Sequence, residues 1–171
     1  MKSEMTAGGT PLAGANANRP VDYLDLKKYA GEWHEIARLP NAFQRQCADS
    51  VSATYTLLGD GTVDIRNACR TQRGQFDARV GVGRPTAIPG ALKVCFAPGW
   101  LFWLPFVWAD YWVVGLDLSY QWALVGGPSR RRLWILCRTP KMKRALFEKL
   151  QEAASVMGYE TSQLVLTSTL A

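Results

Sequence analysis

Hydrophobic and polar residues alternate along most of the chain between residues 32 and 138, which is the pattern of β-strands that bury one face. In the segment of residues 51–57, VSATYTL, the apolar and aromatic side chains fall on one face and the hydroxyl side chains on the other. In the first such segment the alternation places on one face Trp33, Glu35, Ala37 and Leu39. We expect eight strands, at residues 32–39, 51–57, 62–69, 75–83, 91–96, 111–117, 122–125 and 132–138.

One helix is predicted after the eight strands. Thr139 is a suitable N-cap, and Pro140 suits the first helical position. Apolar residues then recur at helical spacing as far as Gly158, which can end the helix in the left-handed conformation. A short ninth strand is expected at residues 163–167. The order predicts an all-β fold, an eight-stranded up-and-down antiparallel barrel with one C-terminal α-helix packed on it and room inside for one small ligand.

Length and composition narrow the classes of function. A chain of 171 residues predicts one domain, at 21–171, after a flexible arm of small and polar residues at 1–20 that lacks the apolar segment of a secretory signal. The net charge of +6 at pH 7 permits an anionic partner, either a nucleic acid or an acidic lipid surface. The single histidine, His34, excludes a His-rich metal site, and we expect no metal and no cofactor.

Three short motifs stand at the places that one protein family requires. They are Gly31-Glu32-Trp33 at the first strand, Asp117-Leu118-Ser119-Tyr120 between the sixth and seventh strands, and Arg138 at the end of the eighth. With them the chain resembles the lipocalins, which are calycin barrels, and in particular the bacterial outer-membrane lipoprotein type and its relative apolipoprotein D. The resemblance covers about residues 21–166 and implies a barrel that binds a hydrophobic small molecule.

The geometry of such a barrel gives these motifs a structural role. Trp33 begins the first strand and Arg138 ends the eighth, so both lie at the same end of the barrel. These two strands become neighbours when the barrel closes, and the Arg138 guanidinium can then stack on the Trp33 indole. The residues that we expect to hold this closed floor, and not to touch ligand, are Gly31, Trp33, Asp117, Tyr120 and Arg138.

Inward-facing positions of the strands are the candidate ligand contacts. They are Ala53, Tyr55, Val63, Ile65, Asn67, Leu92, Val94 and Trp134. The resemblance points in particular to Tyr55, Asn67 and Trp134, and the Tyr55 hydroxyl and the Asn67 amide could hold a carboxylate or phosphate head group. The alternative is a filled core without a cavity, and the small inward residues Ala53, Gly81 and Gly83 count modestly against it.

An apolar segment at residues 97–109, APGWLFWLPFVWA, is not expected from a generic barrel. It is shorter than the ~20 residues of a membrane-spanning helix and contains two prolines. It joins the fifth and sixth strands at the open end, beside the basic segment Arg130-Arg131-Arg132. We hypothesise that its aromatic side chains form a lid over the mouth and contact an anionic membrane. The alternatives are a cap folded onto the rim and a homodimer contact. The aromatic residues of this proposed lid are Trp100, Phe102, Trp103, Phe106 and Trp108.

The four cysteines allow one disulfide. Cys47 and Cys69 both lie at the open end of neighbouring strands, so they can pair if the compartment is oxidising. The alternative is two buried thiols. Cys95 is expected near the rim and Cys137 at the floor, so these two are not expected to pair.

The family resemblance implies binding and transport or storage of a fatty acid or lysophospholipid, in membrane maintenance, in the periplasm or at the outer membrane. The alternative is a lipid-modifying enzyme built on the same barrel. His34 and Glu35 alternate to opposite faces, however, and no base is placed beside Cys69, so we expect no catalytic residues. Lys and Arg are scattered without an RNA-binding motif, and we expect no nucleic-acid partner.

Overall fold

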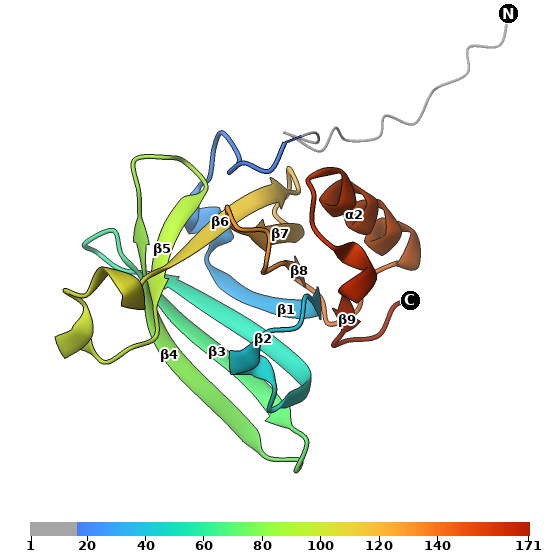
Figure 1. The fold of residues 1–171 in the computed structure, drawn as a ribbon, viewed down its shortest axis with the longest axis horizontal. Helices are drawn as coiled ribbons and strands as arrows, with labels where there is room; N and C mark the ends of the chain where they lie inside the picture. The colour runs from blue at the N-terminus through green and yellow to red at the C-terminus, as the bar shows by residue number, and fades with distance from the viewer. Residues whose placement is uncertain (1–16) are drawn as a thin grey trace, which may run out of the picture.

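The computed structural model describes residues 17–171, and in it one antiparallel sheet closes into a barrel (Figure 1). Strands β2 to β8 pair in sequence order, and β1 pairs with both β8 and β2, which closes the ring. The predicted eight-stranded up-and-down barrel is confirmed. The strands are β1 (Gly31–Arg38), β2 (Cys47–Leu57), β3 (Val63–Thr71), β4 (Phe76–Pro85), β5 (Ala91–Cys95), β6 (Ala109–Leu116), β7 (Trp122–Gly126), β8 (Trp134–Cys137) and β9 (Val165–Leu166).

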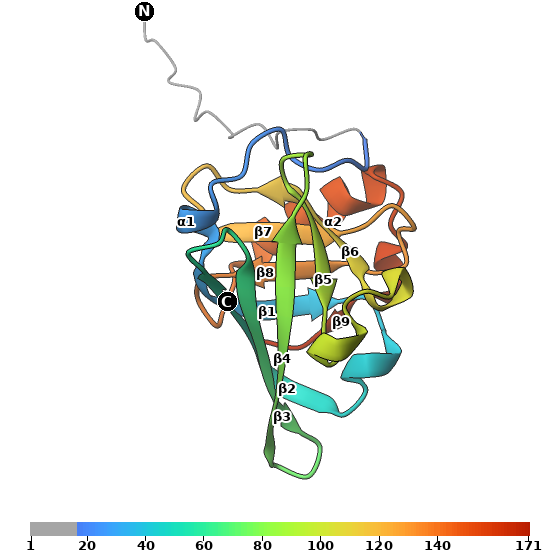
Figure 2. The ribbon, with the colours of Figure 1, turned by 90° about the vertical axis from the view of Figure 1, so that its left-hand side faces the viewer.

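The strands differ in length around the barrel. Strands β2, β3 and β4 are the longest, and the β3–β4 hairpin extends past the other strands (Figure 2). The predicted ninth strand is only two residues long, and it pairs with the end of β1 at Ala37 and Arg38. Four short 3-10 helices lie in the connections: η1 (Ala42–Gln44), η2 (Gly99–Leu101), η3 (Pro105–Val107) and η4 (Thr161–Gln163).

The α-helix α2 (Arg144–Val156) packs on the outside of the barrel beside β1, β7 and β8 (Figure 1). Its apolar stripe, with Phe147, Leu150 and Ala154, joins Leu124 and Ile135 of the sheet in one buried core. A second core fills part of the barrel interior around Trp33. The expected packing of one C-terminal helix on the barrel is therefore confirmed.

The predicted start of this helix at Thr139 and Pro140 is wrong. Helix α2 begins at Arg144, and its N-cap residue Lys143 makes no side-chain cap. The intervening residues are held differently, because Met142 forms a parallel bridge with Leu170 near the end of the chain. The end of the helix agrees better with expectation, since the residue after its C-cap is Gly158, with φ +95°.

A β-bulge in β1 shifts which side chains face the barrel interior. Glu35 pairs with Leu136 and Ala37 with Ile135, so that Ile36 is an extra residue between two consecutive pairs. The simple alternation that placed Ala37 and Leu39 beside Trp33 and Glu35 is therefore wrong. Past the bulge, Ala37 and Leu39 belong to the core under α2. Arg38 instead reaches Glu35 inside the barrel.

The short helix α1 (Leu26–Tyr29), which the sequence pattern did not predict, leads into the closed floor of the barrel. Asp25 caps it by accepting hydrogen bonds from the Lys27 and Lys28 amides. The Tyr29 carbonyl accepts a hydrogen bond from Trp33 Nε1 at 2.8 Å. Helix α1 thereby fixes the buried indole on which the floor is built.

Arg138 joins the chain segments of the floor. Its guanidinium carbon lies 3.8 Å from the Trp33 ring centroid, which confirms the predicted cation–π contact. It donates hydrogen bonds to five carbonyl oxygens, those of Lys28, Tyr29, Ala30, Glu32 and Tyr120. Gly31 has φ +101°, and a Cβ there would lie 3.2 Å from Arg138 Nη1. A glycine therefore suits both the backbone conformation and the close approach.

The connection between β6 and β7 completes the floor. The Asp117 carbonyl accepts from the Tyr120 amide at 2.9 Å, which closes the turn. The Tyr120 hydroxyl accepts from the Asp25 amide at 3.0 Å and so ties the turn to α1. The three motifs therefore meet at one end of the barrel.

The predicted N-terminal arm, residues 1–20, lies mostly outside the described residues. Within residues 17–20, Asn18 contacts the barrel: its amide donates to the Gly127 carbonyl at 2.9 Å, and its oxygen accepts from the Tyr159 hydroxyl at 2.6 Å. These bonds place this part of the segment against the barrel.

Replacing Arg138 tests the importance of the floor for stability. We expect Arg138→Met to lower the free energy of unfolding by about 3 kcal/mol, because five carbonyl acceptors lose a charged donor. Arg138→Lys is the matched control, since it keeps the charge over the indole but loses the planar fork. Its free energy of unfolding should lie between those of the wild type and Arg138→Met. Urea unfolding measures the difference. A loss below about 0.5 kcal/mol in Arg138→Met would contradict this role.

Candidate functional site

A cavity of about 440 Å³ occupies the barrel interior. Most of the predicted ligand contacts line it: Ala53, Tyr55, Ile65, Asn67, Val94 and Trp134. A completely filled core is therefore excluded. Cavities of this size and mostly apolar lining hold drug-sized or single-chain molecules.

The other two predicted contacts, Val63 and Leu92, lie below the cavity. They face a separate void of about 10 Å³ next to α1, which is about large enough for one water molecule. Both side chains are buried in the packed interior core. Their inward orientation was predicted from the alternation, but their depth in the barrel was not.

The two inward glycines of β4 make room for protein side chains. A Cβ on Gly81 would lie 2.6 Å from the Phe96 ring, and one on Gly83 would lie 3.3 Å from Ile65. The idea that these glycines indicate space for ligand is therefore wrong. They allow the Phe96 ring and the neighbouring aliphatic side chains to pack against β4.

Three tyrosines form a chain of hydrogen bonds at the deep end of the cavity. The Tyr29 and Tyr111 hydroxyl oxygens are 2.6 Å apart, and the Tyr111 hydroxyl donates to that of Tyr55 at 2.8 Å. Each phenol carries one hydrogen, so Tyr29 must be the donor to Tyr111. The hydrogen of the Tyr55 hydroxyl has no acceptor among the described residues, and Tyr55 lines the cavity.

Burial keeps these phenols protonated. It raises the pKa of Tyr55 to about 12, against the hydrogen bond with Tyr111, which lowers it. Burial also raises the pKa of Tyr29 and of Tyr111 well above the ordinary value of 10. The deep end of the cavity therefore offers a neutral hydroxyl donor and no phenolate at physiological pH.

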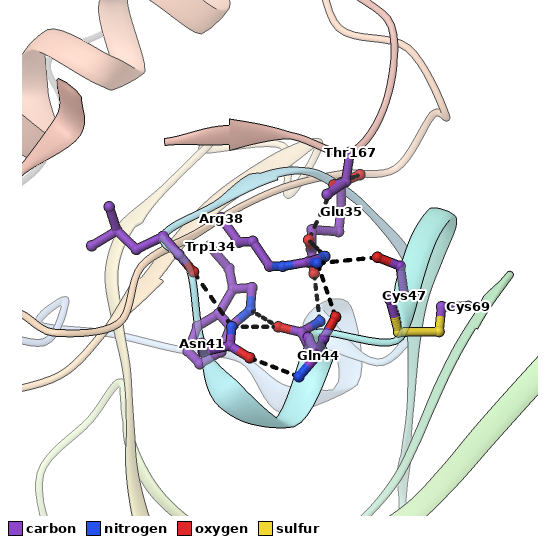
Figure 3. A network of polar contacts seen from close by, with 9 residues as sticks. Glu35, Arg38, Asn41, Gln44, Cys47, Cys69, Trp134 and Thr167 are labelled. Carbon is purple, nitrogen blue, oxygen red and sulfur yellow. Dashed lines mark hydrogen bonds and ion pairs between the residues drawn. A yellow bond between two sulfur atoms is a disulfide. The ribbon is translucent and has the colours of Figure 1, made fainter. Parts of the chain in front are cut away.

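A polar network forms one side of the cavity wall (Figure 3). Trp134 Nε1 donates to Gln44 Oε1 at 2.9 Å, which fixes the position of the indole. Asn41 Nδ2 donates to the same oxygen at 2.7 Å, and the Gln44 amide nitrogen donates to Glu35 at 2.9 Å. Glu35, Gln44 and Trp134 all line the cavity.

A buried ion pair is the centre of this network. Arg38 Nη1 donates to Glu35 Oε1 at 2.8 Å, and the two side chains are 9% and 4% exposed. The same Glu35 oxygen accepts from the Thr167 hydroxyl at 3.0 Å. Because each charge has its counter-charge and further hydrogen bonds, the pair adds little net charge to the cavity.

The mouth of the cavity is basic. Arg79 and Arg132 line it. Asp110 lines it as well, but its carboxylate is paired with Lys93 at 2.6 Å. The balance of charge around the mouth is therefore positive, which favours an anionic group on a molecule that enters.

The aromatic segment at residues 97–109 divides into two sets of side chains. Phe102 and Trp108 pack on the Arg84 guanidinium, with ring centroids 5.6 and 4.3 Å from its central carbon. The remaining three, Trp100, Trp103 and Phe106, are 74%, 77% and 79% exposed. Phe106 lines the cavity as well. The segment therefore reaches the mouth through Phe106 and is anchored on β4 through Phe102 and Trp108.

Cys47 and Cys69 form a disulfide, with their Cα atoms 5.5 Å apart. The predicted pairing is confirmed, and the alternative of two thiols is excluded. Cys95 and Cys137 are free and buried. The disulfide joins the start of β2 to β3 beside the polar network (Figure 3).

The residues considered for catalysis do not converge. His34 Nε2 lies 3.6 Å from the exposed carboxylate of Glu32, whereas Glu35 lines the cavity. Cys69 is bonded to Cys47 and is no free nucleophile. Within residues 17–171 no group of three or more His, Cys, Asp or Glu side chains is placed to hold a metal. None of the helices in that range has the length and apolar character needed to cross a membrane.

A family model described as a lipocalin-like domain matches residues 24–169. The chain belongs to the lipocalin family. Temperature-induced lipocalin-1 of Arabidopsis thaliana is 40% identical over 147 residues, which are 84% of this chain and 78% of that protein. Outer membrane lipoprotein Blc of Escherichia coli (strain K12) is 36% identical over 159 residues, which are 91% and 84%.

Two more distant comparisons agree with this assignment. Apolipoprotein D of Mus musculus is 25% identical to this lipocalin over 153 residues, which are 84% of this chain and 76% of that protein. The structure of insecticyanin from the tobacco hornworm Manduca sexta superposes with a TM-score of 0.69 at 20% identity, covering 88% of this chain and 84% of that one, which shows the shared fold. The resemblance predicted from the three motifs is confirmed.

Several wall residues of this lipocalin were not found from the sequence. Arg79 could have been found, because β4 alternates and Arg79 is the register partner of Asn67. Arg38 points inward only because of the bulge at Ile36, and Gln44 lies on a 3-10 helix outside the strands. No periodic signal could have identified these last two.

The buried tyrosines predict how stability depends on high pH. The unfolded chain loses the Tyr55 proton near pH 10 and the folded protein near pH 12, so this stabilisation is present below pH 10 and is lost as the pH rises to about 12. We expect the free energy of unfolding to fall by up to about 1.4 kcal/mol per pH unit for each such tyrosine, with a shallower slope in Tyr55→Phe. Urea unfolding between pH 8 and 12 measures both slopes.

Tyr23→Phe, which alters a tyrosine that is 72% exposed, is the control for this series. Equal slopes in Tyr55→Phe and the wild type would show that Tyr55 titrates alike in the folded and unfolded states.

Proposed function

We propose that this lipocalin binds a single-chain lipid, a fatty acid or lysophospholipid, in its barrel cavity for transport or storage. The observation that carries the proposal is the 440 Å³ cavity, with an apolar wall and a basic mouth. Lipocalins bind small hydrophobic molecules, and an acyl chain fits the apolar wall while an anionic head group suits the arginines. A charged head alone would gain nothing from the apolar wall.

The polar contacts of the head group are assigned to Tyr55 and Asn67. In the register Ala53 pairs with Asn67 and Tyr55 with Ile65, so Tyr55 and Asn67 are diagonal neighbours about 7–8 Å apart. The Tyr55 hydroxyl has a hydrogen to donate, and Arg79 pairs with Asn67 across β3 and β4. One carboxylate or phosphate with its neighbouring oxygens can span these groups. Trp134, held by Gln44, packs on the acyl chain.

The proposed setting is the cell envelope, in membrane maintenance. The support comes from the likeness to the outer membrane lipoprotein Blc, which extends over 91% of this chain. A disulfide is consistent with the oxidising conditions of an exported protein. The location that we propose is therefore the periplasm or the outer membrane.

Native mass spectrometry of freshly purified protein tests the binding function. We expect the wild type to carry a co-purified lipid and Asn67→Trp to carry none, because the indole fills the cavity next to Ala53. Arg66→Trp is the matched control, since Arg66 is adjacent on β3 but exposed, and it should retain the lipid. Affinity for an added fatty acid should fall at least about tenfold in Asn67→Trp only, which corresponds to ~1.4 kcal/mol.

The same experiment distinguishes the enzyme alternative. An empty wild-type barrel that hydrolyses lipid esters would favour a lipid-modifying enzyme over a carrier. Equal lipid content in Asn67→Trp and the wild type would place the ligand outside the cavity.

We propose in addition that the open end contacts an anionic membrane surface. The support is the exposure of Trp100, Trp103 and Phe106, which lie on one loop that Arg84 holds through Phe102 and Trp108. Exposed aromatic groups of this size mark interaction sites, and Trp suits the head-group region of a bilayer. The arginines of the mouth supply attraction to anionic lipids.

Co-sedimentation with vesicles that contain phosphatidylglycerol tests the membrane contact. We expect the triple change Trp100→Ser, Trp103→Ser and Phe106→Ser to reduce binding at least about tenfold, since three exposed aromatic side chains lose their insertion. The control is Ile88→Ser with Leu118→Ser, which removes exposed apolar residues from connections at the floor end, and it should bind as the wild type does.

Unchanged vesicle binding in the triple variant would exclude this membrane contact. If the triple variant also changes from dimer to monomer in analytical ultracentrifugation, the loop is a homodimer contact instead.

A further inference from the structure

Strands β1 and β2 separate toward the open end of the barrel. These strands pair only from Gly31 with Tyr55 to His34 with Ser52, and beyond this point β2 pairs with β3 alone. That remaining ladder is irregular, with register shifts between Cys47 and Asp49 and again between Asp49 and Ser52. Over this stretch the backbone hydrogen bonds of the barrel no longer hold β2 to β1.

Side chains close the wall where the strands separate (Figure 3). Arg38 Nη2 donates to the backbone carbonyls of Gln44 at 3.1 Å and Cys47 at 3.3 Å. Arg38 Nη1 donates to the Glu35 carboxylate, which also accepts a hydrogen bond from the Gln44 side chain. Arg38 thereby connects β1, the η1 loop and the first residue of β2.

The Cys47–Cys69 disulfide is the covalent link at the same point. It ties the first residue of β2 to β3, beyond both irregularities of the ladder. Cys47 is half-buried and Cys69 is 3% exposed, so the bond is reached from the Cys47 side. The cavity wall residue Gln44 and the cystine are therefore connected through Arg38 and the Cys47 carbonyl.

We propose that the disulfide and the cavity are coupled, so that reduction of Cys47–Cys69 opens this wall and weakens ligand binding. This inference rests on the proposed lipid-binding function. With the bond intact, the Cys47 carbonyl is held against Arg38, Gln44 keeps its place, and the Trp134 indole is fixed on the cavity side. Without it, the start of β2 has no covalent link and keeps the irregular ladder to β3, the Asp49–Arg70 ion pair and the Arg38 hydrogen bond.

The reductant is a dithiol. One thiolate attacks the disulfide at a sulfur, forms a mixed disulfide and releases the other cysteine as a thiol. The second thiolate of the reductant then releases the second cysteine and closes its own cyclic disulfide. Two electrons and two protons pass from the dithiol to Cys47 and Cys69, which balances the exchange.

Coupling of this kind is reciprocal. If reduction weakens ligand binding by a certain factor, bound ligand must disfavour reduction of the disulfide by the same factor. A loaded protein would keep its disulfide in a dithiol buffer that opens the empty one. The redox state would then report whether the cavity is occupied.

The experiment uses the full chain with Cys95→Ser and Cys137→Ser, so that only the disulfide responds to dithiothreitol. Dansylated undecanoic acid is the probe, and its dissociation constant is measured for the oxidised and the reduced protein. We expect reduction to raise the dissociation constant by roughly fivefold or more. A smaller change, or a change in the other direction, would overturn the coupling.

Two further measurements keep the test clear. If the oxidised protein fails to bind the probe, the proposed lipid-binding function itself fails, which is a different outcome from equal affinities. The equilibrium constant for reduction, measured with and without saturating probe, must shift by the same factor as the dissociation constant. Loss of the β-sheet circular dichroism signal on reduction would show that reduction acts by unfolding the protein generally, which would overturn the proposed local opening.

The route through Arg38 is tested by the double change Glu35→Gln and Arg38→Met, which removes both buried charges together. If the Arg38 contact with Cys47 carries the coupling, the affinity of this variant becomes independent of the redox state. A variant with the full redox dependence of the parent would overturn this route. If it does not fold, hydrogen exchange of residues 39–50 in the reduced parent replaces it, and faster exchange there is the expected result.

Discussion

The stacking of Arg138 on Trp33 is the contact on which the rest of the barrel depends. A sheet closes only if its first and last strands are brought together, and this arginine lies where β8 ends and β1 begins. One charged, planar group donates to five carbonyl oxygens, four between Lys28 and Glu32 and one in the β6–β7 turn. Because this end is sealed by the protein itself, the space for a ligand is confined to the other end.

The sequence predicted those parts of the fold that depend on neighbouring residues, and it missed those that depend on contacts between distant segments. Period-two alternation identified eight strands, and the order of the strands identified the barrel. It failed at Ile36, since a bulge is set by the packing of β1 between the helix core and the barrel interior. It failed again at Thr139, where suitable capping residues lost to a bridge between Met142 and Leu170, which are distant in sequence.

The residues of the candidate site also divide into those that strand alternation predicted and those that contacts between distant segments position. Tyr55 and Asn67 lie on regular strands, so alternation placed them correctly in the cavity wall. Val63 and Leu92 face inward too, but whether an inward residue lines a cavity or packs below it depends on how neighbours such as Tyr29 fill the floor. Gln44 reaches the wall from a loop, through contacts with Trp134 and Glu35 that no periodicity encodes.

The bulge at Ile36 has a consequence for how this sequence can change over time. In this bulge Ile36 and Ala37 both face the core under α2, while Glu35 before them and Arg38 after them both face inward. Deleting Ile36 would leave Ala37 opposite Ile135 and Arg38 opposite Trp134, so every later side chain of β1 would keep its face. The cost would fall on the core beneath the helix, which would lose one fully buried apolar side chain. The bulge thus gives α2 a second neighbouring side chain from β1 and leaves the charge pair inside the barrel.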